Sequence, residues 1–133
     1  DLAHLPIESA SIDILLDIFS PANYGEFRRV LTENGILIKI IPTENHLKEI
    51  RQKVQEQLTK KDYSNQDIKE HFQEHFSIQS RQIASLAKPI TAEQRQALLS
   101  MTPLLFHVDH TKIDWSQLTE ITIEAEILVG KPL

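Results

Sequence analysis

The 133-residue sequence contains no cysteine and only three glycines. Without cysteine the chain can have neither disulfides nor a thiolate metal site, a composition that is compatible with a reducing compartment. With so few glycines it contains no Gly-rich dinucleotide turn, no Walker phosphate loop and no nucleophile elbow. The usual loops that bind a nucleotide phosphate are therefore not predicted from these residues.

Long apolar runs and excess positive charge are also lacking. No stretch approaches the roughly 20 apolar residues that cross a bilayer, and no basic-then-apolar signal segment opens the chain, so we expect a cytoplasmic protein. The formal net charge is -5. A strongly basic nucleic-acid-binding surface is not expected, because phosphate neutralisation needs clustered Lys and Arg. With 41% apolar residues, the length suits one compact domain.

The pattern of apolar residues predicts an α/β fold. Nearly continuous apolar sequence over residues 12–19 and 36–41 is typical of parallel strands that are covered on both faces. Between them, residues 24–32 have helical spacing, and Asn34-Gly35 is expected to end that helix in a left-handed conformation. A strand, a helix and a strand in this order form a βαβ unit.

The rest of the chain predicts two helices, a polar connection, two amphipathic strands and a further helix. Residues 43–60 read as a long helix, residues 60–65 as a polar connection, and Ser64 or Asn65 as the cap of a helix that runs to about His75. Alternation over residues 76–83 and 120–129 predicts the strands, and Thr91 is expected to cap a helix that runs to about Ser100. One side of the last strand would carry Ile121, Ile123, Ala125, Ile127 and Val129.

Residues 71–75 match the His-x-x-Glu-His pattern of a class of zinc metallopeptidases. In those enzymes two imidazoles on one helical face hold zinc and the Glu activates water. A catalytic zinc also needs a third protein ligand, and no suitable helix follows. A solvated helix end is therefore favoured, and no metal site is predicted here. His107 and His110 are interpreted as loop surface.

Acidic side chains lie near the first strand, and an aromatic residue follows it. Asp17 is close to the carboxyl end of the strand, where a carboxylate could orient a ligand or accept a proton. The alternative for Glu8, Asp13 and Asp17 is solvated charge at strand ends. Residues 19–21, Phe-Ser-Pro, follow at the edge where open α/β sheets bind ligands. An ordinary strand-to-helix turn is the alternative there.

Several segments resemble the C-terminal half of a Rossmann-like class I S-adenosylmethionine methyltransferase. They are residues 1–7, 11–13, 19–21, 26–31 and 34–37. More narrowly, residues 18–21, 42–47 and 97–106, the last containing Leu-Leu-Ser-Met-Thr-Pro, are similar to bacterial 23S ribosomal RNA guanine-N1 methyltransferases. The resemblance covers essentially all 133 residues. The family's glycine-rich loop, ribose-binding acidic residue and cysteine-bound zinc module have no counterpart.

The resemblance implies S-adenosylmethionine as the cofactor and assigns residues to it. Asp1 would accept a hydrogen bond from the adenine amino group, and the backbone amide of Leu2 would read the ring. Phe19, also assigned to the cofactor, would line the methyl-transfer site together with Ser20 and Pro21. Residues implied in substrate binding are Ser20, Pro21, Met101, Thr102 and Pro103. Asp17 stands where a relative carries a basic residue and Phe19 replaces a Tyr, so no catalytic base is assigned.

For the whole chain, residues 1–133, the resemblance implies part of one methyltransferase domain. The sequence has no initiator Met, and its first strand lacks an upstream neighbour, so we expect a severed half that is inactive alone and acts on 23S rRNA when intact. The family's sheet order would place the four strands as the fourth, fifth, seventh and sixth. The exposed edge of the first strand would favour a homodimer or aggregation. A noncatalytic α/β interaction domain and a small-molecule methyltransferase are the alternatives.

Overall fold

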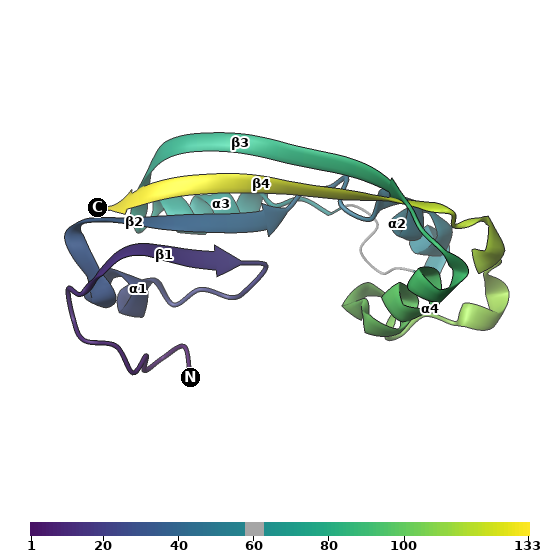
Figure 1. The fold of residues 1–133 in the computed structure, drawn as a ribbon, viewed down its shortest axis with the longest axis horizontal. Helices are drawn as coiled ribbons and strands as arrows, with labels where there is room; N and C mark the ends of the chain where they lie inside the picture. The colour runs from purple at the N-terminus through teal and green to yellow at the C-terminus, as the bar shows by residue number, and fades with distance from the viewer. Residues whose placement is uncertain (58–62) are drawn as a thin grey trace. The chain divides into compact units, whose positions relative to one another are not determined.

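The computed structural model of the chain describes residues 1–57 and 63–133 (Figure 1). Residues 58–60 of the predicted helix over 43–60, and residues 60–62 of the predicted polar connection, lie outside the described residues. The strands are β1 Ile12–Ile18, β2 Leu31–Pro42, β3 Phe76–Pro89 and β4 Glu120–Pro132; the α-helices are α1 Tyr24–Val30, α2 Lys48–Val54, α3 Gln66–Gln73 and α4 Ala92–Met101. None of the helices in the described part has the length and apolar character that spanning a bilayer requires.

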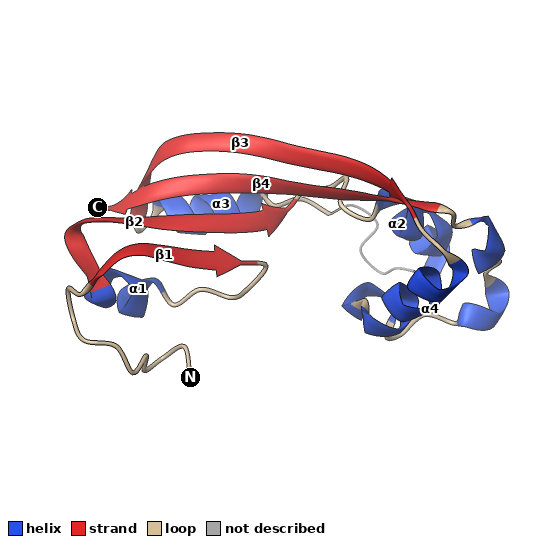
Figure 2. Ribbon diagram, viewed as in Figure 1, coloured by secondary structure: helices blue, strands red, loops and turns tan. Residues whose placement is uncertain are grey.

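The four strands form one sheet in the order β1-β2-β4-β3 (Figure 2). Strands β1 and β2 are parallel neighbours, and α1 lies between them in the chain. Strand β2 pairs with β4 in the antiparallel direction. This confirms the predicted order of fourth, fifth, seventh and sixth strands. It also confirms the mixed α/β fold class.

The contacts of the chain group it into two compact units. Unit 1 comprises Asp1–Thr43, Ser64–Ala84 and Ala125–Leu133, and unit 2 comprises Glu44–Tyr63 and Ser85–Glu124. The core of unit 1 contains Tyr24, Phe27, Leu31, Leu37, Ile41, Phe72, Phe76 and Leu128. The core of unit 2 contains Ile50, Val54, Leu105, Leu118 and Ile121. That residues 1–133 belong to a single methyltransferase domain stays a prediction.

The two faces of the sheet in unit 1 differ in burial. Residues of α1 and α3 pack with Leu37 and Ile41 of β2 on one face. On the other side of β1, the side chains of Ile14, Leu16 and Ile18 are 59%, 60% and 54% exposed. The prediction that β1 is covered on both faces is therefore wrong for this chain, because the helices of unit 1 contribute their apolar residues to one face.

The predicted end of the first helix at Asn34-Gly35 is also wrong. Helix α1 ends at Val30, and both residues lie inside β2. Gly35 has no positive φ. A Cβ at this position would lie 3.0 Å from the backbone oxygens of both Ile12 and Thr32, at the place where the register of β1 and β2 shifts. The glycine is needed because backbones approach closely at an irregularity in the strand pair.

Two predicted helix caps have different outcomes. The Thr91 hydroxyl accepts a hydrogen bond from the Gln94 amide at 3.1 Å, and the Thr91 amide donates to the Gln94 side chain at 3.0 Å. This is the reciprocal cap that the sequence indicated for α4. Asn65 precedes α3 as predicted, but its side chain does not cap the helix, whereas the Ser64 hydroxyl accepts a hydrogen bond from the Gln66 amide at 3.2 Å. The Asn65 side-chain amide instead donates to Glu126 at 2.9 Å.

In unit 1, the side of β4 that carries Glu126 is more deeply buried than the side that was predicted from the apolar alternation. Glu126 and Leu128 are 2% and 0% exposed, whereas Ile127 and Val129 between and beside them are only half-buried. Glu126 is paired across the sheet with the buried Ile41 of β2. Two cations compensate its charge, Arg81 Nε at 2.6 Å and Lys69 Nζ at 3.4 Å, and the Asn65 side-chain amide donates a hydrogen bond to it.

Candidate functional site

A buried ion pair lies at the carboxyl end of β1. Asp17 and Lys39 are register partners on β1 and β2, and Lys39 Nζ is 2.6 Å from Asp17 Oδ2. The side chains are 2% and 5% exposed. The Lys39 ammonium also donates to the Ser20 carbonyl at 3.1 Å. One buried cation therefore connects the strand to the turn that follows it.

The turn after β1 presents Phe19 at the edge of the sheet. Phe19 has a φ of 50°, in the left-handed region that residues other than glycine rarely adopt. Its amide donates to the Ile40 carbonyl at 3.0 Å, and the residue remains 50% exposed. Ser20 and Pro21 follow and are exposed. A locally strained residue held by surrounding bonds is a feature that clusters at functional sites.

Tyr24 packs at the start of α1 and is 4% exposed. Burial, and after it the nearby carboxylate of Asp17, raises the pKa of Tyr24 to about 12. The phenol is therefore protonated at neutral pH. Ahead of Tyr24, the Asn23 side chain accepts a hydrogen bond from the Glu26 amide at 3.0 Å and so begins the helix.

Asp1 and Leu2, the predicted adenine-binding residues, lie in an exposed N-terminal segment. One carboxylate oxygen of Asp1 accepts from the Ala3 amide at 2.9 Å, and the other is 3.7 Å from His4 Nδ1. The Asp1 side chain is 73% exposed and Leu2 is 38% exposed. Both residues are accessible to a ligand, and their role stays a prediction.

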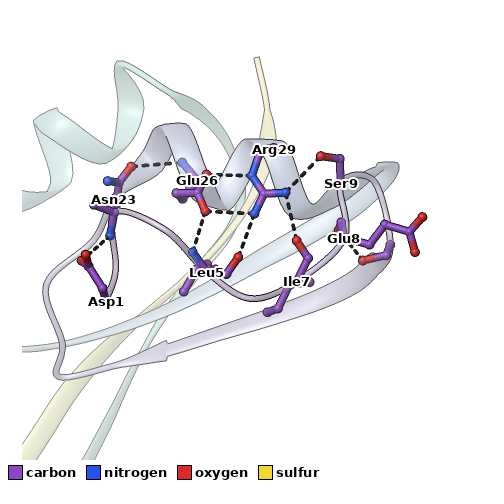
Figure 3. Close-up of polar contacts among 10 residues, drawn as sticks. Asp1, Leu5, Ile7, Glu8, Ser9, Asn23, Glu26 and Arg29 are labelled. Atoms are coloured by element: carbon purple, nitrogen blue, oxygen red, sulfur yellow. Dashed lines mark hydrogen bonds and ion pairs between the residues drawn. The ribbon is translucent and has the colours of Figure 1, made fainter.

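This N-terminal segment is held against α1 by two side chains of that helix (Figure 3). Glu26 accepts a hydrogen bond from the Leu5 amide at 2.8 Å and from Arg29 Nε at 2.7 Å. The Arg29 guanidinium donates further to the Ile7 carbonyl at 2.9 Å and to the Ser9 hydroxyl at 3.0 Å. Residues 5–9 are thus anchored by one carboxylate and one guanidinium.

Met101, Thr102 and Pro103, the other predicted substrate residues, belong to unit 2. Met101 ends α4, is 70% exposed, and lines a groove of about 290 Å³ with Ile90, Ala97, Leu98, Ile121 and Ile123 among others. Thr102 is 7% exposed, and its hydroxyl donates to the Leu98 carbonyl at 2.6 Å. Pro103 begins a 3-10 turn. The groove favours Met101 over Thr102 as a residue that touches a ligand.

Lys39 is the residue of this candidate site that the sequence did not predict. The signal was present, because a single cation between Ile38 and Ile40 in an apolar strand needs a buried partner. The structure shows that partner to be Asp17, so solvated charge is the wrong interpretation of that residue. Asp13, the other acidic residue of β1, is exposed, and its carboxylate accepts a hydrogen bond from the Thr32 hydroxyl at 3.0 Å.

Glu26 makes the stability of the N-terminal segment depend on pH. Hydrogen bonds from Arg29, and then from the Leu5 amide, lower the pKa of Glu26 from 4.5 to about 2. A carboxyl whose pKa is lowered on folding stabilises the folded state above its unfolded value, and that contribution is lost as the pH falls through the folded value. We expect Glu26→Gln to unfold at a lower temperature at pH 7 and to lose less stability than the parent between pH 4.5 and pH 2. Thermal unfolding at a series of pH values measures this, with Glu33→Gln, an exposed carboxylate of the same unit, as control. An unchanged pH profile for Glu26→Gln would contradict the role of this side chain.

Comparison with known proteins gives similarity in sequence and in fold. No family model matches the chain. It is 31% identical over 133 residues, 98% of its length, to the Bacillus subtilis (strain 168) protein YxjB, which is named provisionally as a 23S rRNA (guanine-N(1)-)-methyltransferase. It is 22% identical over 134 residues, 97% of its length, to the 23S rRNA (guanine(748)-N(1))-methyltransferase of Streptomyces fradiae. These matches confirm the resemblance described from the sequence.

The chain spans about half the length of these curated relatives, 47% of the first and 48% of the second. A crystal structure from Bacillus halodurans C-125, provisionally titled a methyltransferase, superposes with a TM-score of 0.57 at 13% identity. The superposition covers 98% of this chain and 68% of that one. At this identity the likeness shows the fold alone.

Proposed function

We propose that this chain, similar along 98% of its length to a protein named for methyl transfer to guanine N1 of 23S rRNA, is part of an S-adenosylmethionine-dependent methyltransferase of that kind. The sequence similarity is the observation that carries the proposal. Because the chain spans about half of its curated relatives, we infer that it needs further residues to be active. A ribosomal substrate places the proposed activity in the cytoplasm.

Asp1, Leu2 and Phe19 of unit 1 support this proposal by the groups that they offer to the cofactor. An exposed carboxylate at Asp1 is an acceptor for an adenine amino group, and the Leu2 amide is a donor for a ring nitrogen. Phe19, half-exposed beside the end of β1, offers an aromatic surface at the edge where α/β sheets bind ligands. S-adenosylmethionine, when bound, supplies an activated methyl group. The protein's main task is then to align the acceptor atom with that group.

For the acceptor base, Ser20 and Pro21 would provide contacts beside Phe19 in unit 1, and the assignment of Met101, Thr102 and Pro103 to the substrate rests on the family resemblance. Guanine N1 is paired in a duplex, so the base would have to be unpaired to enter a pocket. Its N1 proton must leave during the reaction. Asp17 is not suited to accept that proton, because its carboxylate is buried and bound by Lys39. We assign Asp17 and Lys39 to positioning the Phe19-Ser20-Pro21 turn.

A chimera tests this function directly. The segment of the Bacillus subtilis relative that matches this chain is replaced by residues 1–133, and the product is incubated with a 23S rRNA hairpin and S-adenosylmethionine. A methyl group on N1 blocks Watson–Crick pairing, so reverse transcription is expected to stop at a guanine. A soluble chimera that produces no stop, beside an active parent, would overturn the proposal.

Within an active chimera, Phe19→Ala is expected to reduce kcat/KM by about tenfold or more, because the cofactor or acceptor would be misaligned. Phe106→Ala is the matched control, since Phe106 is also an exposed phenylalanine, 63% exposed, and lies in unit 2. Equal activity of both variants would remove Phe19 from the proposed site.

One observation favours the alternative of a noncatalytic interaction domain. The exposed row of Ile14, Leu16 and Ile18 on the edge strand β1 is a surface on which another polypeptide, including a second copy of this chain, could pack. Light scattering on the isolated chain reports such self-association. The methylation assay separates the two functions, because an interaction domain leaves the guanine unmodified.

A further inference from the structure

Three side chains with metal-ligating atoms converge where α3 ends. His71 lies in the last turn of the helix, Glu74 is its C-terminal cap, and His75 follows directly. One ligating atom from each lies within 4.8 Å of those of the other two. His71 Nδ1 is 3.0 Å from Glu74 Oε2. We propose that His71, Glu74 and His75 bind a divalent transition metal ion, with zinc as the ion that this ligand set suits best.

The types of ligand agree with this choice. Two imidazole nitrogens and one carboxylate oxygen form a common ligand set for zinc, and the same set accepts cobalt and nickel. Bonds of about 2.1 Å in a tetrahedral site place neighbouring ligand atoms about 3.4 Å apart. Separations of at most 4.8 Å need to close by no more than about 1.4 Å to reach that geometry. Glu74 can rotate toward the imidazoles, since its side chain is 66% exposed.

The two imidazoles are already held near their binding positions. The ring of Tyr24 stacks on His75 with centroids 5.1 Å apart and meets His71 edge to face at 5.0 Å. The two histidine rings are themselves 5.3 Å apart. Tyr24 is buried at the start of α1, so it is a rigid support for both rings. Holding ligands in place before binding lowers the entropic cost of capturing an ion.

The backbone beneath the cluster is equally constrained. Phe72, which follows His71, and Phe76, which follows His75, are 0% and 1% exposed in the core of unit 1. The His75 carbonyl accepts a hydrogen bond from the Leu133 amide at 3.1 Å. The helix end and the start of β3 therefore keep the three side chains on one surface. An ion bound there would connect α3 to the two residues that follow it and stabilise the folded chain.

The proposed site differs from the peptidase site that the sequence pattern suggested. In the peptidases the Glu is the base that activates water, and a third ligand comes from elsewhere. Among the residues that the structure describes, the group of potential ligands consists of His71, Glu74 and His75. The carboxylate is therefore needed as the third ligand, and a water molecule completes the tetrahedron. The site is independent of the proposed methyl transfer.

Nuclear magnetic resonance on the unaltered 133-residue chain tests the proposal. We expect one equivalent of zinc chloride at neutral pH to shift the imidazole ring signals of His71 and His75 together, and to saturate at a one-to-one ratio. The other four histidines, His4, His46, His107 and His110, are internal references. Shifts at His107 and His110 without shifts at His71 and His75, or no shifts at all, would overturn the proposal.

Calorimetric titration of zinc into variants provides the second test. His71→Gln with His75→Gln is expected to weaken binding by at least a hundredfold, and Glu74→Gln by about tenfold. His4→Gln with His107→Gln removes the same number of imidazoles from exposed positions and should bind as the parent does. Circular dichroism without metal checks that each variant is folded. Zinc affinity that survives in a folded His71→Gln, His75→Gln variant contradicts the site.

Discussion

Replacement of Lys39 by methionine is expected to lower the free energy of unfolding by about 3–5 kcal/mol, because it leaves the buried Asp17 carboxylate without its cation. Asp17 is 4% exposed, so water cannot replace the lost ammonium without opening the end of β1. The bond from Lys39 to the Ser20 carbonyl is lost at the same time. Urea unfolding followed by circular dichroism measures the change.

The matched control is the double variant Asp17→Leu, Lys39→Met. It removes both charges together, and apolar replacement of a whole buried ion pair is often neutral or stabilising. We therefore expect the double variant to recover most of the loss seen in Lys39→Met. If Lys39→Met unfolds within about 1 kcal/mol of the parent, the pair is not the buried, isolated interaction described here.

Gly130→Ala is expected to be the most disruptive single-methyl change in the chain. A Cβ on Gly130 would lie 2.5 Å from Cζ and 2.8 Å from Cε1 of Phe72, and 3.1 Å from Cβ of Phe76. Phe72 is fully buried and cannot move outward without disturbing the core of unit 1. Overpacking of this kind costs about 1–3 kcal/mol or more. Urea unfolding again measures the loss.

Gly25 offers the same substitution without the steric conflict. A Cβ there would meet Asn23 Oδ1 at 3.4 Å, an ordinary contact, and Gly25 lies within helix α1. Gly25→Ala should therefore be neutral or stabilising by up to about 1 kcal/mol. Adding Phe72→Leu to Gly130→Ala should relieve part of the overpacking. A Gly130→Ala chain as stable as the parent would show that β4 and α3 are not packed as described.

Strand order and fold class could be predicted because they follow from features that the sequence carries locally. Apolar runs over 12–19 and 36–41 identify β1 and β2, and the family resemblance supplies the order of the remaining strands. The cap at Thr91 was readable for the same reason, since both of its bonds join residues three positions apart. Local signals of this kind survive in a single sequence.

Features that depend on distant parts of the chain could not be read in this way. The partner of Asp17 is on another strand, and Glu126 is compensated by Lys69 and Arg81 from α3 and β3. The exposed face of β1 depends on where helices pack rather than on the composition of the strand. Gly35 was predicted to end a helix because Asn-Gly is a common stop signal. The structure shows that a glycine is needed there because the backbone of Ile12 approaches closely. The spacing of His71, Glu74 and His75 suggested that their side chains converge. It did not indicate that the ring of Tyr24 packs against the histidine rings.

The position of β4 between β2 and β3 has a consequence during synthesis on the ribosome. Leu37 of β2 pairs with Gly130 of β4, and all of unit 2 lies between them in the chain. Unit 2 is therefore translated completely before Ala125–Leu133, the part of β4 and the C-terminus that belongs to unit 1. Until Leu128 is available, Phe72 and Phe76 lack one of their core neighbours and stay open to chaperones or to aggregation. A ribosome that stalls before Ala125 would release a chain that contains all of unit 2 but lacks Leu128 in the core of unit 1.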